Sequence, residues 1–182
     1  MKFNHDKFLT ACGNFNDHQR QGMDFLLTCF ENDPDMSADV RWIAYAIATI
    51  QRETAGTYQP IAEYGKGAGR PYGEPDSLTG QTYYGRGFCQ VTWKANYAEF
   101  SPITGVDLVA YPDKALDPGI AYKILSYGMV HGSFTGVGLH RYIAGDECDY
   151  FNARRIINGI DHAQEIADAA KWFETTLKEC LI

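Results

Sequence analysis

The sequence predicts a mainly α-helical domain that carries one long loop region, within which a short β-hairpin can form. Two observations lead to this fold class. Apolar residues recur at helical spacing along several stretches of the 182-residue chain. From Gly56 to Gly87, by contrast, glycine, proline and tyrosine are interleaved, which is typical of irregular structure. A chain of this length suits one well-buried core, so we expect a single domain spanning 1–182.

The first helical region spans about 6–31 and breaks near Gly13. The apolar residues that we expect in its core are Phe8, Leu9, Phe25, Leu26 and Leu27. A turn at 32–35 follows the region, because proline and aspartate are frequent in turns. Ser37 or Asp39 can then cap the next helix with a side-chain oxygen.

That next helix, ending at Glu53, is apolar on several faces at once, so we expect it to be central rather than peripheral. It stops near Gly56, because glycine takes the left-handed conformation common at helix ends. Burial and the partial negative charge of a helix C-terminus both favour the protonated form of a carboxyl group. We therefore interpret Glu53 as a candidate proton donor. The alternative is an ion pair with Arg52 at the helix end.

Helical spacing resumes in three later stretches, and a short helix is expected between the last two of them. The predicted ranges are about 92–100, 118–130 and 163–181, with the short helix near 149–157. Turns are predicted at Asp113-Lys114 and at 136–138. We expect Trp42 and Trp93 to belong to the core rather than to a binding surface.

Composition excludes several classes of function. The net charge is −7 and no basic cluster exceeds Arg154-Arg155, which argues against a nucleic-acid partner. The five cysteines include no Cys-x-x-Cys pair and the five histidines show no ligand spacing, so we expect no metal and no other cofactor. No apolar run reaches the roughly 18–20 residues of a membrane span.

The N-terminus lacks the apolar core of a secretory signal, and the odd number of cysteines favours a reducing compartment. We therefore expect a protein that is made in the cytoplasm. We also expect it to be a monomer. If the protein acts outside the cell, another factor must release it.

The segment from Tyr83 to Tyr97 carries the second block of candidate chemistry. Its glycines allow the backbone to approach a ligand closely. Its hydrogen-bonding side chains are Arg86, Gln90, Thr92 and Asn96. Aromatic rings combined with neutral polar groups suit a sugar polymer, because sugar rings present apolar faces as well as hydroxyl groups. An uncharged glycan also needs no basic groove.

Three blocks of the chain together resemble the catalytic core of glycoside hydrolase family 19. They are Gln51-Arg52-Glu53-Thr54-Ala55-Gly56, the string Tyr84-Gly85-Arg86-Gly87-Phe88-Cys89-Gln90-Val91-Thr92-Trp93-Lys94-Ala95-Asn96-Tyr97, and Asn152-Ala153-Arg154-Arg155-Ile156-Ile157-Asn158-Gly159. This family contains chitinases and related phage endolysins that cut peptidoglycan. The resemblance implies a lysozyme-like, two-lobed α-helical fold with a substrate cleft. It also implies inverting hydrolysis of β-1,4 bonds to N-acetylated amino sugars.

The resemblance also implies roles for individual residues. Glu53 matches the general acid of the family. Gln90, Thr92 and Asn96 match positions that bind sugar or hold the attacking water, with Thr92 in the catalytic group. The remaining substrate-binding candidates are Tyr83 or Tyr84 near the scissile sugar, and Arg155 and Asn158 along the cleft. Arg86 either contacts the substrate or ties the loop to a carboxylate such as Glu53 or Glu63.

Inversion needs a second carboxylate that activates water. Glu63 is favoured, because the segment around it is close enough in sequence to Glu53 to line the same cleft. Glu74 is the alternative base.

Two kinds of function fit these features. The first is an enzyme that cleaves a glycan: small size, a missing signal and the absence of a wall-binding module favour an endolysin that degrades peptidoglycan in the host periplasm, with a chitinase as the alternative. The second is a non-catalytic glycan-binding relative. The sequence does not separate peptidoglycan from chitin, since both contain the N-acetyl group and the β-1,4 link.

Overall fold

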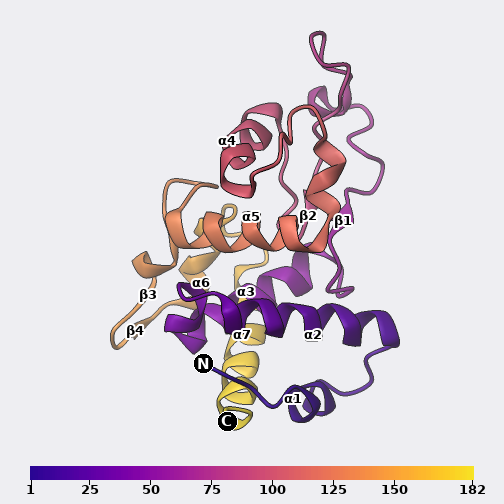
Figure 1. Cartoon of the computed structure of the whole chain (residues 1–182). Coiled ribbons are helices and arrows are strands. Elements are labelled where there is room, and N and C mark those ends of the chain that lie inside the picture. Colours follow the sequence, from indigo (N-terminus) through magenta and orange to yellow (C-terminus); the bar gives the residue numbers. More distant parts are fainter. The chain divides into compact units, whose positions relative to one another are not determined.

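Helices dominate the structure, a computed structural model that describes all residues from 1 to 182 (Figure 1). The chain divides into two compact units. The first unit comprises 1–58 and 128–182, and the second comprises 59–127. None of the helices combines the length and the apolar character that a membrane span requires. The mainly α-helical class predicted from the sequence is confirmed.

The α-helices are α1 (His5–Ala11), α2 (Asp17–Asn32), α3 (Val40–Glu53), α4 (Lys94–Thr104), α5 (Pro118–His131), α6 (Tyr150–Ala153) and α7 (Ala163–Glu179). Short 3₁₀ helices lie at Met36–Ala38, Pro71–Gly73, Pro112–Leu116, Leu139–Arg141 and Arg154–Ile156. Strands β1 (Ile61–Ala62) and β2 (Arg86–Gly87) form one antiparallel pair, and β3 (Ile143–Ala144) and β4 (Glu147–Cys148) form another. The 3₁₀ helix at Pro112–Leu116 replaces the predicted turn at Asp113-Lys114, because proline at the first helical position fixes φ for a helical turn.

Helix α3 is the centre of the first unit, as predicted. The Asp39 carboxylate caps it by accepting a hydrogen bond from the backbone N–H of Arg41. Every residue from Ile43 to Ile50 is buried, since α7 packs along α3. Glu53 is the last helical residue, and Gly56 follows with a φ of +73°, the left-handed conformation expected at this helix end.

The N-terminal region forms two helices separated at Gly13, which has a φ of +84°. Asn16 and Gln19 make a reciprocal capping box at the start of α2. Of the predicted core residues, Phe25 is half-buried, and the others are buried: Phe8, Leu9, Leu26 and Leu27. Phe3 pairs with Leu181 in an isolated β-bridge, so the two chain ends lie together beside α7 (Figure 1).

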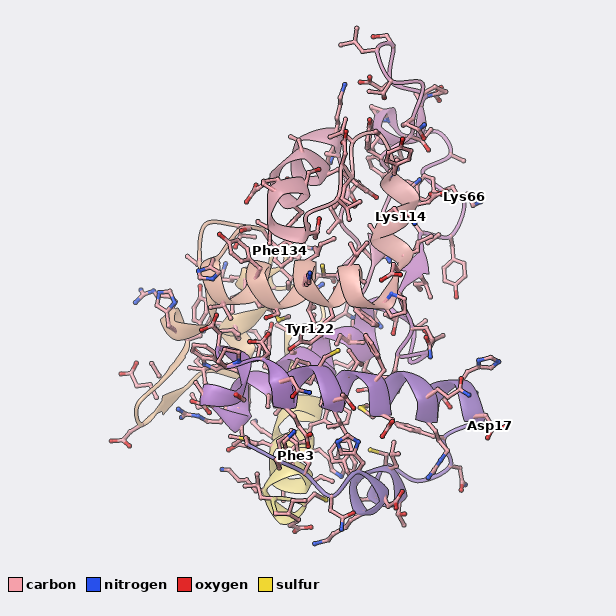
Figure 2. All side chains as sticks on the ribbon, in the orientation of Figure 1. Phe3, Asp17, Lys66, Lys114, Tyr122 and Phe134 are labelled. Atoms are coloured by element: carbon pink, nitrogen blue, oxygen red, sulfur yellow. The ribbon has the colours of Figure 1, made fainter.

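The C-terminal end of α5 depends on a glycine. Phe134, labelled in Figure 2, packs against this helix at Gly128. A Cβ atom at Gly128 would stand 2.3 Å from the Phe134 ring, which no real contact allows. The Phe134 ring would therefore have to move if a larger residue replaced Gly128.

The second unit contains the glycine- and tyrosine-rich region. Strand pairing sets Ile61 opposite Gly87 and Ala62 opposite Arg86, so the two ends of the region are joined, but residues 63–85 separate the strands and the pair is not the short hairpin predicted from the sequence. The Asp76 carboxylate fixes the middle of the region by accepting hydrogen bonds from Lys94 Nζ at 2.8 Å and from the backbone N–H of Thr79 at 3.0 Å. The hydrogen bonds from Lys94 and Thr79 lower the pKa of Asp76 to about 2.

Two expectations for the segment that follows this region are wrong. Helix α4 begins at Lys94 rather than near residue 92, because Trp93 has a φ of +74° and cannot belong to a right-handed helix. Trp93 is also not a core residue, since 51% of it is exposed. Trp42 is half-buried, and its indole N–H donates a hydrogen bond to the carbonyl of Ile143 at 3.0 Å.

Candidate active site

Glu53 is held by an arginine from a distant part of the chain. Its Oε1 accepts a hydrogen bond from Arg154 Nη1 at 2.7 Å. Arg154 Nε donates to the carbonyl of Asp161 at 3.0 Å, which fixes the guanidinium at a second point. The Arg154 side chain is 4% exposed and that of Glu53 is 17% exposed. The carboxyl group is therefore oriented and still accessible.

This environment differs from the one expected from the sequence. The sequence predicts burial among apolar groups for Glu53, whereas the structure places a guanidinium on its carboxyl group. The alternative partner, Arg52, turns away from Glu53: its Nη2 lies 2.6 Å from His162 Nε2 and its Nη1 lies 3.6 Å from Glu165. Glu53 is thus in an ion pair, with a partner that the sequence analysis did not identify.

Arg154 is the site residue that sequence reasoning missed. The sequence analysis named Arg155 as a cleft residue and counted Arg154 only as part of the short basic pair. A signal was present, since Arg154 follows Tyr150 at the four-residue spacing that places two side chains on one helical face. Both residues are buried, whereas Arg155 is exposed.

A second carboxylate is held in the second unit. Glu63 Oε1 accepts a hydrogen bond from the Tyr72 hydroxyl at 3.0 Å, and Oε2 accepts one from the backbone N–H of Gly85 at 3.1 Å. The backbone N–H of Glu63 donates to the carbonyl of Gly85 at 2.7 Å, which extends the β1–β2 pairing. The hydrogen bond to Glu63 raises the pKa of Tyr72. Glu63 is consequently half-exposed and fixed in orientation.

The alternative base, Glu74, is in a different situation. It is exposed at the end of the 3₁₀ helix Pro71–Gly73. No hydrogen bond of the kind that orients Glu63 is made by its carboxylate. The geometry therefore favours Glu63 as the second carboxylate.

The three polar candidates after β2 form one hydrogen-bonded chain. Gln90 Nε2 donates to the carbonyls of Ile61 at 3.0 Å and Gly87 at 3.1 Å. The Thr92 hydroxyl donates to the carbonyl of Gln90 at 2.9 Å, and Asn96 Nδ2 donates to the carbonyl of Thr92 at 2.7 Å. All three side chains are half-buried. These hydrogen bonds fix their orientation, and their roles in binding sugar or water stay predictions.

Arg86 has the structural role that the sequence analysis left open, with a different partner. Its side chain is 3% exposed, and Nε donates to Asp113 at 2.8 Å rather than to Glu53 or Glu63. Its Nη1 donates to Tyr97 Oη at 2.9 Å, and its guanidinium lies 3.6 Å above the Tyr84 ring. Arg86 therefore braces the interior of the second unit.

Tyr83 and Tyr84 share that interior. The Tyr83 hydroxyl donates to the carbonyl of Val109 at 2.9 Å, and the Tyr84 carbonyl accepts a hydrogen bond from Tyr97 at 2.6 Å. Both side chains are buried. Neither presents an exposed ring to a sugar, because the rings pack inside the unit.

The remaining candidates lie close to Arg154 in the chain. Arg155 and Asn158 are exposed. Arg155 Nε donates to Asn152 Oδ1 at 3.3 Å, and Asn158 Oδ1 accepts a hydrogen bond from the backbone N–H of Gly159 at 2.9 Å. Both are accessible to a ligand, and contact with substrate stays a prediction. No group of three or more His, Cys, Asp or Glu side chains is arranged to hold a metal ion.

The fold is that of known chitinases. The crystal structure of chitinase C from Streptomyces griseus matches 97% of this chain and 76% of that chain, with a TM-score of 0.65 and 21% identity. The structure of the family GH19, class IV chitinase from Zea mays matches 97% of this chain and 82% of that chain, with a TM-score of 0.57 and 19% identity. The chain is therefore a mainly α-helical protein with the fold of the family 19 chitinases.

Sequence comparison agrees with the fold. The chain is 29% identical over 136 residues to endochitinase A2 of Pisum sativum. The aligned region covers 66% of this chain and 38% of the relative. The chain thus spans well under half of the length of that relative. No family model matches the chain. The resemblance to glycoside hydrolase family 19 is confirmed.

Proposed function

We propose that this chain is a glycoside hydrolase that cleaves the β-1,4 bonds of chitin by an inverting acid/base mechanism. The observation that carries the proposal is the Glu53 carboxyl group, oriented by Arg154 at the end of α3 and still accessible. The similarity to endochitinases supports chitin rather than peptidoglycan as the substrate. This reverses the order of preference drawn from the sequence.

In this mechanism Glu53 acts in its protonated form, in which one carboxyl oxygen still accepts the hydrogen bond from Arg154, and it donates its proton to the oxygen of the leaving sugar. Glu63 is ionised and removes a proton from the water that attacks the anomeric carbon from the opposite face. Thr92 holds that water through its hydroxyl group. Arg154 stabilises the carboxylate that Glu53 becomes after it has lost its proton, because the guanidinium carries a permanent positive charge.

The mechanism sets a geometric requirement. The carboxyl groups of Glu53 and Glu63 must act on the same bond, at a separation of roughly 6.5–9.5 Å that leaves room for water. Neutral amides such as Gln90, Asn96 and Asn158 suit a neutral polymer. The net charge of −7 is no obstacle, since chitin brings no phosphate or carboxylate.

The proposal is tested by incubating the purified protein with chitin hexamer and, in parallel, with purified peptidoglycan. We expect hydrolysis of the hexamer, with the α-anomer as the first product detected by proton NMR, because attack by water inverts the β-linkage. A β-anomer would refute the inverting mechanism.

Cleavage of peptidoglycan alone would restore the endolysin hypothesis and, with it, action in a host periplasm. Binding of the hexamer without any hydrolysis would identify a non-catalytic glycan-binding relative. Either outcome would refute the chitinase proposal.

The assignment of the base predicts a contrast between two glutamates. Glu63→Gln should lower kcat on chitin hexamer by about 100-fold or more, because the carboxylate that accepts the proton of water is lost. Glu74→Gln is the matched control, and it should leave kcat within about twofold, since surface changes away from the site have small effects. Steady-state kinetics on both variants checks this. The opposite pattern would assign the base to Glu74.

A further inference from the structure

Trp93 combines two features that core packing does not explain. Half of this large apolar side chain is exposed, at 51%. Its backbone has a φ of +74°, a left-handed conformation that bulky residues rarely adopt. Backbone strain of this kind is concentrated at functional sites.

The backbone at this position requires the left-handed conformation but does not require tryptophan. The N–H of Trp93 donates to the carbonyl of Tyr83 at 2.9 Å, and its carbonyl accepts a hydrogen bond from Asn96 N at 3.0 Å at the start of α4. Glycine would make both backbone hydrogen bonds in the same conformation without strain. The indole ring is therefore the only feature that tryptophan adds.

The ring is held beside the candidate base. Trp93 and Tyr72 contact each other edge to face, with ring centroids 5.2 Å apart and an interplanar angle of 79°. The hydroxyl of the same Tyr72 donates to Glu63 Oε1 at 3.0 Å. Tyr72 thus contacts both the exposed indole and the Glu63 carboxylate, which activates water in the proposed mechanism.

Two further contacts fix the residues on either side of Trp93. Lys94, the next residue, is tied to Asp76 at 2.8 Å. Asn96 and Thr92, the polar candidates on either side, are joined by a hydrogen bond of 2.7 Å. An aromatic ring that is already ordered loses little conformational entropy when a ligand stacks on it. This is the arrangement expected of a binding platform.

We propose that Trp93 is a stacking platform for one N-acetylglucosamine ring of the chitin strand, and that Tyr72 is a positioning residue that links this platform to Glu63. The inference rests on the proposed function and names a binding position within it. The apolar face of a sugar ring fits the indole, and the half of Trp93 that stays exposed in the free protein becomes covered. Trp93 therefore contributes to substrate affinity, and Tyr72 contributes to the rate of the chemical step.

The platform is tested in a protein that carries Glu53→Gln, because this variant should bind chitin hexamer without cleaving it. Binding of chitin hexamer is measured by titration calorimetry for this protein and for versions that also carry Trp93→Gly or Trp93→Ala. We expect both to raise Kd about tenfold, which corresponds to the loss of one well-placed contact. Trp172→Ala, which removes a similarly exposed tryptophan from α7, should leave Kd unchanged.

Thermal unfolding separates loss of binding from loss of folding. Trp93→Gly relieves the left-handed strain, so its Tm should stay the same or rise by about 2–4 °C while its affinity falls. Trp93→Ala keeps the strain and loses the ring. An unchanged Kd in both Trp93 variants would overturn the platform while leaving the proposed function standing. If the Glu53→Gln protein itself binds no chitin hexamer, the proposed function fails and the platform with it.

Tyr72→Phe tests the positioning role, because it keeps the ring and removes only the hydroxyl group. With Glu53 intact, we expect kcat on chitin hexamer to fall about 3–10-fold, with KM and Tm unchanged, since a misplaced base slows chemistry without weakening binding. Trp93→Gly should show the reverse split, with the larger change in KM. An unchanged kcat in Tyr72→Phe would overturn the positioning role.

Discussion

Replacing Glu53 by glutamine is expected to lower kcat on chitin hexamer by about 10²–10⁴-fold, the range of general acid catalysis. Glutamine cannot donate a proton to the leaving oxygen. It can still accept the hydrogen bond from Arg154, so the geometry around the site is retained. Single-turnover kinetics with excess protein measures the loss at the chemical step.

Glu165→Gln is the control for this change. Glu165 is an exposed carboxylate on α7 that lies 3.6 Å from Arg52, so its loss alters the charge of the same unit without touching Glu53. The control should retain full activity. If Glu53→Gln folds normally and keeps more than about a tenth of the activity, Glu53 is not the proton donor.

Replacing Arg154 by methionine should destabilise the protein by about 3 kcal/mol, because it leaves the poorly exposed Glu53 carboxylate without its partner. This corresponds to a fall in Tm of about 6–12 °C for a chain of this size. Activity should fall as well, since Glu53 loses the contact that orients it. Differential scanning calorimetry measures the change in stability.

Arg155→Met is the matched control, because it removes the neighbouring guanidinium, which is exposed and makes only one long hydrogen bond, at 3.3 Å. Its Tm should change by no more than about 2 °C. The double variant Arg154→Met, Glu53→Gln should be less destabilised than the sum of its two single changes, as expected for coupled charges. Equal destabilisation by Arg154→Met and Arg155→Met would remove the ion pair from the description of the site.

The later helices show what apolar spacing predicts correctly in this chain and what it does not. The short helix predicted near 149–157 is present as α6 followed by the 3₁₀ helix Arg154–Ile156. The start of α4 was misplaced, because helical spacing says nothing about the left-handed backbone of Trp93. In that conformation the backbone of Trp93 makes hydrogen bonds with the backbones of Tyr83 and Asn96. Tyr83 lies in the loop region, so the first of these contacts is not local to the helix.

Some features of the candidate site could likewise be predicted from the sequence, and others could not. Glu53 could be selected from the sequence, because its position at the end of an apolar helix and its motif are both local features. Glu63 was favoured over Glu74 from its distance to Glu53 in the chain, whereas the Tyr72 hydroxyl and the Gly85 N–H that orient its carboxylate appear only in the structure. Tyr83 and Tyr84 were expected beside the substrate and are buried, because aromatic rings suit a core and a binding surface equally well.

The sequence by itself determined the helical class, the long irregular region and the candidate acid, since each of these depends on residues that are neighbours in the chain. Only the tertiary structure decided that Arg154, 101 positions from Glu53, is its partner, and that Trp93 is exposed beside Tyr72. The physical reason is that spacing along the chain fixes local backbone geometry. Contacts between distant side chains depend on packing, which no local pattern encodes.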